Sequence, residues 1–338
     1  MRYDLRFHGE TLDEIGGRAR AAEQAGFGAL WSQELYTNPF VSPAAVLGFT
    51  REIRVGSAIA LGFVRSPLSM ATTALEMDRL SNGRFILGLG SGVQRQITEW
   101  HGASFGRPAP HLKECIQLTR LIIQNAPLGK PITFEGEYYK VNIKGFSVPR
   151  QPVRGHIPIY AAAIGPGMAR VCGEVADGVL GQIMASLAWI QDVVLPNLKI
   201  GLDRAGRQRK EIDLSLTVAM AISKDVKKAK RDLAKTMSFY STVGTYHKLF
   251  AAQGFDKEVT AVREAFRKHG RHGPHCWELI PDEMVDAYFV SGSPDDARQK
   301  VAQYEGIADS LVLVPPSYFL DSDETMEYEQ SILETFGT

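Results

Sequence analysis

The chain has 338 residues, of which 44% are hydrophobic and 22% charged, and its 38 basic residues balance its 38 acidic ones. This neutral balance favours neither nucleic acid nor an anionic membrane as a bulk partner, and it leaves little charge repulsion against a homodimer. The three cysteines make no disulfide framework. The first residues, Met1 to Asp4, lack an apolar signal-peptide core, and no apolar run reaches the roughly 20 residues that span a bilayer. We therefore expect a cytoplasmic protein.

Strand-like and helix-like segments alternate along the chain. Thr11 with Glu14 three residues later is typical of a helix start, and Gly26 of a helix end. Ser66-Pro67 starts another helix, which Asn82-Gly83 ends. The predicted strands are 5–8, 28–31, 53–61, 85–89, 157–162, 178–180, 214–222 and 310–314. The predicted helices are 11–26, 41–50, 66–80, 110–123, 167–176, 188–205, one beginning at 293, and 323–336.

Eight strands that are each followed by helical sequence predict a (β/α)8 TIM barrel. Residues 224–281 are too long and too helical for one crossover, so we expect a helical insertion after the seventh strand. Residues 131–141 predict a small hairpin outside the barrel. An open doubly wound sheet is the alternative, which the lack of a GxGxxG fingerprint after the first strand disfavours. No linker marks a boundary, so 1–338 is predicted to be a single domain.

The loops after the strands of such a barrel form its active site. The glycine-rich stretch 88–92 lets the backbone approach a planar ligand closely, and the loop 161–168 enters a helix whose N–H groups suit a phosphate. Residues 57–62 could form a bulge that supports a ring system. Trp31 and Glu34 follow the second strand, where they could stack on a ring and move a proton. Each segment also fits a purely structural interpretation as turn, helix start, core strand or barrel rim.

A histidine-rich stretch resembles a set of metal ligands. It contains His269, His272, His275 and Cys276, but no further ligand group stands at zinc-site spacing from it. Its glycines and proline favour a mobile loop, so we expect no metal. The chain has no GxSxG, P-loop or HExxH motif, which excludes the common hydrolase and kinase chemistries.

Three stretches resemble the bacterial luciferase-like family, and within it the coenzyme F420-dependent branch. They are RSPLSMATTALEMDRLSNGRFILGLGSG from Arg65, IPIYAAAIGPGMARVCGEVADGVL from Ile157, and VSGSPDDARQKV from Val290. The chain is similar to methylenetetrahydromethanopterin reductases and to actinobacterial F420-dependent oxidoreductases. The resemblance implies a barrel with an insertion after the seventh strand and a deazaflavin or flavin in its mouth.

The resemblance also implies which residues hold the cofactor. A bulge in the third strand, often with a non-proline cis peptide, backs the deazaflavin, and the glycine turn lies against it. The loop after the fifth strand lies near the phosphate, a residue ending the sixth strand hydrogen-bonds there, and Trp31 shapes the pocket. The matching residues are Ala58, Ile59, Gly90, Ser91, Gly92, Ala163, Ile164, Gly165, Pro166 and Gln182.

The chain departs from the family at its proton-transfer residues. Glu34-Leu35 stands where the sugar-phosphate and alcohol dehydrogenases have an Asp-His pair, and Val93 where they have a Glu. Arg6 replaces the Glu of the methylenetetrahydromethanopterin reductases. This argues against alcohol oxidation, which needs a base for the hydroxyl proton. The remaining catalytic candidates are Glu34, His8 and His101.

The resemblance implies an F420-dependent oxidoreductase that transfers a hydride to or from a small organic substrate. The cofactor carries the hydride, and the protein orients the reactants. The sequence LGLGSG favours F420 over FMN. The alternatives are an FMN-dependent luciferase-like monooxygenase and a cofactor-binding relative without catalysis.

Overall fold

A ring of parallel strands forms the centre of the fold. The computed structural model describes residues 1–7 and 9–338. The strand order is β11-β10-β12-β1-β2-β3-β5-β8-β9, and β9 also pairs with β10, so the ring closes. The strand registers are parallel, for example Tyr3 with Leu311 and Gly88 with Tyr160. The structure is a TIM barrel, as the sequence predicts.

The strands lie close to their predicted positions, with three differences. The first strand is earlier than expected, and the predicted strand 53–61 is divided in two. The barrel strands are β1 (Arg2–Arg6), β2 (Ala29–Ser32), β3 (Arg54–Ser57), β4 (Ala60–Leu61), β5 (Phe85–Gly90), β8 (Ile159–Ala163), β9 (Gly178–Gly181), β10 (Asp213–Ile222), β11 (Val290–Gly292) and β12 (Ser310–Val314). The short strand β11 pairs with the far end of β10 and was not predicted.

The helices begin at the residues that the caps predict. The Thr11 hydroxyl accepts a hydrogen bond from Glu14 N, and that of Ser66 accepts one from Ser69 N. Gly26 has a positive φ, as its role after a helix requires. The helices of the first two thirds are α1 (Leu12–Gln24), α2 (Val41–Val46), α3 (Pro67–Leu80), η1 (Gln96–Trp100), α4 (Pro108–Asn125), η2 (Ala126–Leu128), α5 (Pro166–Val175), α6 (Leu187–Trp189), η3 (Ile190–Val194), α7 (Leu195–Arg204) and η4 (Arg209–Glu211).

Two of these helical segments differ from the prediction. The helix expected over 41–50 ends at Val46. The helix expected over 188–205 begins at Leu187 and contains a π-helical stretch, η3, between α6 and α7. Hydrophobic spacing does not distinguish an α-helix from a short π-helical stretch, because both bury a similar face.

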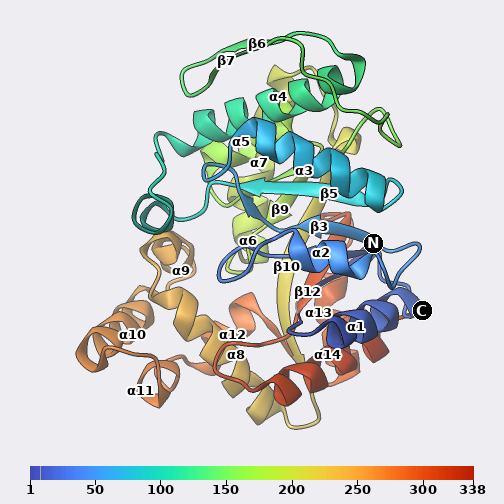
Figure 1. Cartoon of the computed structure of the whole chain (residues 1–338). Coiled ribbons are helices and arrows are strands. Elements are labelled where there is room, and N and C mark those ends of the chain that lie inside the picture. Colours follow the sequence, from blue (N-terminus) through green and yellow to red (C-terminus); the bar gives the residue numbers. More distant parts are fainter. Residues whose placement is uncertain (8) are drawn as a thin grey trace. The chain divides into compact units, whose positions relative to one another are not determined.

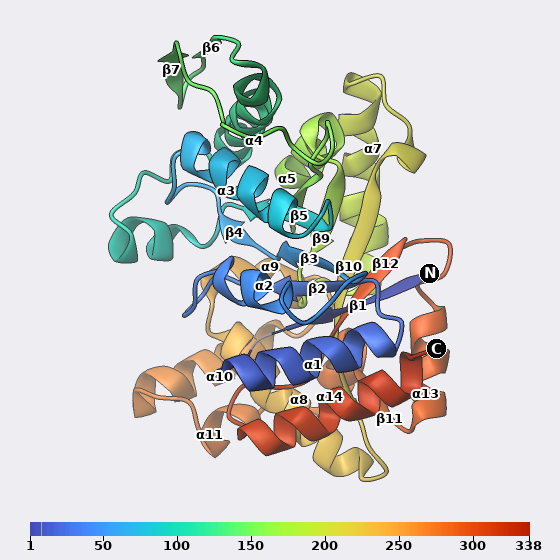
Figure 2. The ribbon, with the colours of Figure 1, turned by 45° about the vertical axis from the view of Figure 1, so that its right-hand side comes forward.

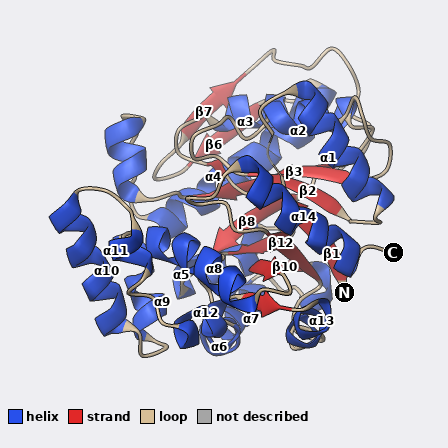
Figure 3. Cartoon of the chain, turned by 90° about the horizontal axis from the view of Figure 1, so that it is seen from below, coloured by secondary structure: helices blue, strands red, loops and turns tan. Residues whose placement is uncertain are grey.

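The helical insertion follows β10, as predicted. Helices α9, α10 and α11 gather beside α8 (Figure 3). Its members and the helices after it are α8 (Val226–Ser241), η5 (Gly244–Tyr246), α9 (His247–Ala251), α10 (Asp256–His269), α11 (Pro274–Trp277), α12 (Asp282–Tyr288), α13 (Pro294–Ala302) and α14 (Ser322–Phe336). No helix in the described part of the chain is long and apolar enough to cross a membrane.

The chain forms two compact units. Unit 1 contains residues 1–5, 182–192 and 216–338, and unit 2 contains 6–181 and 193–215. Strands β1 and β10 each pass from one unit into the other along the chain. Strand β10 is labelled in Figure 1.

The predicted hairpin is present in unit 2. Strands β6 (Ile132–Glu135) and β7 (Lys140–Ile143) pair antiparallel as a separate sheet. The hairpin lies beyond α4, on the side away from β5 (Figure 2). Glu114 of α4 fastens it, because its carboxylate accepts hydrogen bonds from the N–H groups of Glu137, Tyr138 and Tyr139. The hairpin is therefore a rigid addition to the helix layer.

Candidate functional site

The strand ends of unit 2 bring together most of the candidate residues. Between β3 and β4 the Ala58–Ile59 peptide bond is cis, as the family resemblance implies for this position. The backbone on both sides of it is tied to the segment after β2. Ala58 N donates to Ser32 O over 2.6 Å, and Glu34 N donates to Ile59 O over 3.2 Å. The break in the predicted strand 53–61 is therefore held by its neighbour β2.

Three alternate glycines of β5 and its turn lie against the segment 57–61. A Cβ on Gly88 would stand 1.8 Å from Ser57 O, and one on Gly90 would stand 2.8 Å from Ile59 Cδ1. A Cβ on Gly92, which has a φ of 64°, would stand 2.5 Å from Leu61 Cδ2. At such distances a neighbouring atom would have to shift, so the glycines make room for atoms of this chain.

Ser57 strengthens the same junction through its buried hydroxyl. Its Oγ donates to Gly88 O over 2.8 Å and accepts from Gly88 N over 3.0 Å. Ile59 and Ala58 remain half-buried above this fully buried base. We call this junction of the segment 57–61 with Gly88, Gly90 and Gly92 the Ile59 platform, because the half-buried Ile59 side chain lies against Gly90.

Glu34 lies at this platform with its carboxylate fully engaged. Oε2 accepts from Leu61 N over 2.8 Å, and the Arg65 guanidinium donates to both carboxylate oxygens over 2.6 and 2.7 Å. The Glu34 side chain is 8% exposed and that of Arg65 is 21% exposed. A bidentate pair of this kind is strongly directional. Glu34 therefore suits the role of holding the segment 59–65 better than that of carrying a proton.

Of the other two catalytic candidates, the structure describes only His101. His101 follows the π-helix η1 and its side chain is exposed. Among the described residues, no hydrogen bond or ion pair joins it to Glu34. His8 lies outside the described residues. Ser91 is half-buried, and its hydroxyl donates to Gly92 O within the glycine turn.

Trp31 lies in the packed interior below the strand ends. Its side chain is fully buried, and its ring is 5.7 Å from that of Tyr160. A Cβ on Gly56 would stand 2.6 Å from the Trp31 ring, so this glycine makes room for the indole. With no exposed surface, Trp31 suits a packing role rather than direct stacking on a ligand.

The loop after β8 enters α5 with an open N-terminus. Gly165 is the N-cap and brings no side chain, and Pro166 occupies the first helical position. A Cβ on Gly165 would meet nothing within 4 Å, whereas Ala163 before it is buried. Ile164 is half-buried. The helix start thus offers backbone N–H groups and open space, which together suit an anionic group.

Gln182 belongs to unit 1 and uses its side-chain oxygen locally. Its amide oxygen accepts a hydrogen bond from Met184 N, and its backbone oxygen accepts one from Ala185 N. The side chain thereby shapes the turn after β9. Its role toward a cofactor stays a prediction.

The histidine-rich stretch of unit 1 forms ring contacts. His272 lies among the rings of Phe239, Phe266 and Phe319. The His269 and His275 rings are 4.1 Å apart. Across residues 1–7 and 9–338, no group of three or more His, Cys, Asp or Glu side chains is arranged to hold a metal ion.

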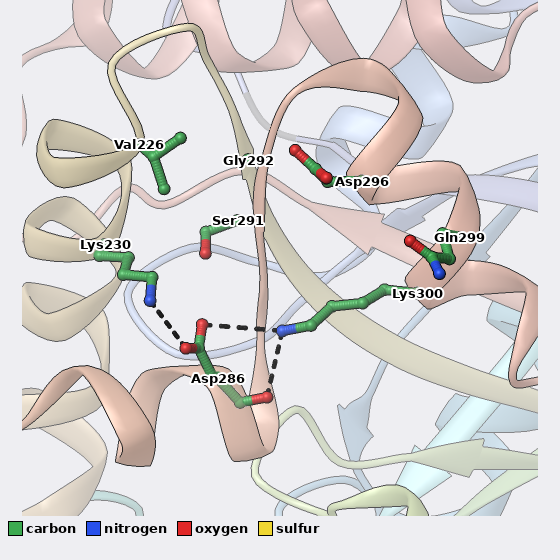
Figure 4. Close-up of a pocket in the computed structure, with 8 residues that line it drawn as sticks. All are labelled: Val226, Lys230, Asp286, Ser291, Gly292, Asp296, Gln299 and Lys300. Carbon is green, nitrogen blue, oxygen red and sulfur yellow. Dashed lines mark hydrogen bonds and ion pairs between the residues drawn. The ribbon is translucent and has the colours of Figure 1, made fainter.

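One pocket of about 380 Å³ lies in unit 1 between α8, α12, β11 and α13 (Figure 4). Asp286 forms ion pairs with two lysines of this pocket. Its carboxylate lies 2.7 Å from Lys230 Nζ and 3.7 Å from Lys300 Nζ. Lys300 also donates to the backbone oxygens of Asp286 and Phe289. Asp296 is the second carboxylate of the lining, so two lysines and two aspartates give the pocket no net formal charge. The ion pairs of Asp286 tie α8, α12 and α13 together, and the lining has no net charge to attract an anion.

The sequence did not identify two residues that hold the platform. Arg65 was treated only as the start of a family stretch, and Ser57 only as a small strand residue. An arginine directly before a Ser-Pro helix start gives no signal by itself. Its partner Glu34 is 31 residues earlier in the chain and is brought near only by the pairing of β2 with β3.

Comparison with known proteins gives consistent matches over almost the whole chain. The sequence profile of the luciferase-like monooxygenase family matches residues 4–310. A 5,10-methylenetetrahydromethanopterin reductase from Archaeoglobus fulgidus is 30% identical, over 85% of each chain.

Two solved structures share the fold. The coenzyme F420-dependent tetrahydromethanopterin reductase from Methanopyrus kandleri superposes with a TM-score of 0.81, 23% identity and 99% coverage of each chain. The FMN complex of the oxygenating constituent of 3,6-diketocamphane monooxygenase from Pseudomonas putida has a TM-score of 0.68 and 18% identity. It covers 100% of this chain and 97% of its own.

Proposed function

Because this chain belongs to the luciferase-like monooxygenase family, we propose that it is a coenzyme F420-dependent oxidoreductase acting on a small organic substrate. The observation that carries the proposal is the Ile59 platform, which rests on Gly90 at the strand ends of a chain 30% identical to a methylenetetrahydromethanopterin reductase. The reductase of known structure from Methanopyrus kandleri depends on F420. A deazaflavin supplies hydride chemistry without activating oxygen.

The residues present fit such a cofactor. Ile59 and Ala58 offer a half-buried apolar surface on which a planar ring system can lie. The uncapped start of α5 offers N–H groups for a phosphate, beside the open space at Gly165. Ala58, Ile59, Gly90, Ser91 and Gly92 are thus our ring-binding residues, and Ala163, Ile164, Gly165 and Pro166 our phosphate-side residues. In this proposal Trp31 supports the platform from below, and Gln182 stays a predicted contact.

The proton chemistry of the site follows from the engagement of Glu34. Its carboxylate is occupied by Arg65 and by Leu61 N, so it positions the platform. The exposed His101 is the remaining described candidate for a proton carrier. Reduction of an activated C=C, C=N or C=O bond suits this site, because water or His101 can supply the proton.

A binding and turnover experiment tests the proposal. Purified protein is titrated separately with F420 and with FMN, and the bound fraction is followed by fluorescence. Reduced F420 is then offered with a panel of acceptors: a quinone, an activated alkene, an imine and a ketone. We expect F420 to bind at least about tenfold more tightly than FMN, a difference of roughly 1.4 kcal/mol. We also expect at least one acceptor to be reduced.

The alternatives correspond to other outcomes. Preferential FMN binding with oxygen consumption would indicate a monooxygenase, like the structural relative from Pseudomonas putida. F420 binding without turnover of any acceptor would indicate a non-catalytic relative. Binding of neither cofactor would overturn the proposal. The homodimer stays a prediction, which sedimentation velocity of the same sample measures.

A further inference from the structure

His111 of helix α4 is a buried residue that contacts three other segments of unit 2. His111 is 6% exposed. Its Nδ1 lies 3.0 Å from Phe105 O, and its Nε2 lies 3.0 Å from Tyr139 Oη. A backbone carbonyl only accepts hydrogen bonds, so Nδ1 carries the proton and donates it. In that tautomer, Nε2 accepts from the Tyr139 hydroxyl. Burial raises the pKa of Tyr139, which keeps that hydroxyl protonated.

The same imidazole is stacked between two aromatic rings. The Phe63 ring lies 3.9 Å away at an interplanar angle of 2°, and the Tyr138 ring lies 4.3 Å away at 12°. Two parallel rings so close to the imidazole cannot share one of its faces, so they lie on opposite faces. Phe63 lies just after the platform segment that ends at Leu61, with Gly62 between them. His111 therefore connects the platform, the hairpin and the residue Phe105.

The hairpin has an independent attachment to α4. The Glu114 carboxylate accepts hydrogen bonds from three N–H groups of the hairpin. Next to it in α4, Cys115 Sγ donates to Gly62 O over 3.3 Å. Removing the polar groups of His111 would thus leave both the hairpin and Gly62 attached. In segment 101–107, His111 holds Phe105 O, whereas Ala103 N donates to Ile97 O and Arg107 pairs with Glu137 independently of it.

Segment 101–107 completes the loop that leaves the carboxyl end of β5. Directly before it, Trp100 is 58% exposed, and His101 opens it as an exposed residue. At its other end Arg107 N donates to Tyr138 Oη over 3.1 Å. Gly106 has a φ of 60°, and its Cβ would stand 2.5 Å from the Tyr138 ring. Both attachments lie near His111.

We propose that His111 is a positioning residue, which fixes segment 101–107 and so holds Trp100 and His101 in place for the substrate. This rests on the proposed function, because the substrate is that of the F420-dependent reaction. His111 acts through the two hydrogen bonds and the ring stack, and it does not contact the reacting atoms.

Hydrogen exchange of the protein without cofactor tests the attachment. His111→Phe keeps a ring between Phe63 and Tyr138 but removes both hydrogen bonds. We expect exchange of the amides in 101–107 to accelerate roughly tenfold, the scale of two lost hydrogen bonds. The amides of 137–139, held by Glu114, should stay protected. General loosening of both segments, or no change in a folded variant, would overturn the proposal.

Two further variants keep the test decisive. Tyr139→Phe removes the hydrogen bond to Nε2 and the contact of the same hydroxyl with Cys115, but it leaves the bond from Nδ1 to Phe105 O. His111→Asn retains a donor for Phe105 O but loses the bond to Tyr139 and the ring stack. In both variants we expect exchange between that of the unmodified protein and that of His111→Phe, because each keeps a donor for Phe105 O. Tyr288→Phe is the matched control, because this buried tyrosine donates to Leu249 O in unit 1. It should leave 101–107 unchanged.

The acceptor assay separates this inference from the proposed function. We expect His111→Phe to raise KM by roughly tenfold, to change kcat less than about threefold and to leave F420 affinity within about twofold. A fall in kcat at unchanged KM would overturn the positioning role. If F420 does not bind the unmodified protein, the proposed function fails while the exchange result still decides the attachment.

Discussion

The Ile59 side chain rests on Gly90, where a Cβ would stand 2.8 Å from Ile59 Cδ1 and 2.9 Å from Cγ1. Ala162 Cβ lies 3.3 Å from the same point. The missing side chain at position 90 therefore determines how deeply Ile59 sits at the strand ends. Any group added there must push Ile59 outward, into the space that the proposed cofactor needs.

Gly90→Ala is expected to weaken F420 binding more than it weakens the fold. The extra methyl group meets the flexible end of Ile59, so overpacking should cost about 1 kcal/mol of unfolding free energy. Displacement of Ile59 should raise the Kd of F420 by roughly tenfold. Urea unfolding and fluorescence titration measure the two effects. An unchanged Kd would show that the platform does not carry the ring.

Gly17→Ala is the matched control for that substitution. Gly17 lies inside α1, and its Cβ would meet nothing within 4 Å. Because alanine favours a helix interior, the protein should gain about 0.5 to 1 kcal/mol of stability. The Kd of F420 should not change.

Glu34→Gln tests whether this side chain positions the platform or carries a proton. Glutamine can still accept from Leu61 N, but it loses the charge that faces Arg65. We expect a loss of about 1 to 3 kcal/mol of stability and weaker F420 binding. The dependence of kcat on pH should keep its shape. Disappearance of one limb of that profile would identify Glu34 as an acid or base.

The exposed pair of Glu76 and Arg79 provides the control for the loss of charge. The Glu76 side chain is 63% exposed. Its replacement by glutamine should cost less than about 0.5 kcal/mol, because solvent screens such pairs. Cofactor binding should be the same as in the unmodified protein.

Trp31→Phe separates packing from ligand stacking. Trp31 is fully buried and fills the space over Gly56. The smaller ring should cost about 1 to 3 kcal/mol of unfolding free energy through the cavity it leaves. The Kd of F420 should stay within about twofold. A large rise in the Kd of F420 without a loss of unfolding free energy would indicate that Trp31 contacts the cofactor.

His272 should make the stability depend on pH in the weakly acidic range. Burial among aromatic rings, with the charge of His275, lowers its pKa below 6.5, and its Nδ1 is buried without a hydrogen-bond partner. The unfolded chain then binds the proton first, so stability is highest above pH 6.5 and falls as the pH decreases.

His272→Phe should remove that dependence. Phenylalanine suits the surrounding rings of Phe239, Phe266 and Phe319 and does not titrate. The variant should lose less stability than the unmodified protein between pH 8 and pH 5, as measured by urea unfolding. An equal loss would contradict the proposed burial of a neutral imidazole.

The barrel was predictable because its signals are local. Caps such as Thr11 and Ser66 and the alternation of apolar segments lie within a few residues of the structure that they specify. The run 53–61 could not be assigned correctly from local signals. Its residues have strand character throughout, yet the strand is interrupted at Ala58, whose N–H donates to Ser32 O. Only the family resemblance indicated a break there.

The candidate site was predictable in position but not in detail. The glycines 88, 90 and 92 correctly indicated a close approach, but the atoms that approach belong to Ser57, Ile59 and Leu61. A glycine in the sequence indicates that another atom comes close to the backbone there, but it does not indicate which atom. The role of Glu34 likewise depends on Arg65, a partner that becomes adjacent only when β2 and β3 pair.

The two compact units are assembled from five stretches of chain, which end within or next to strands β1, β9 and β10 and within the helical run 187–204. No single cut of the gene therefore encodes either unit. Truncation between β1 and β12 would leave both pieces with unpaired strands. Fragments should recover a native fold only when two complementary pieces are supplied together, and domain exchange with a relative would have to replace the barrel as a whole.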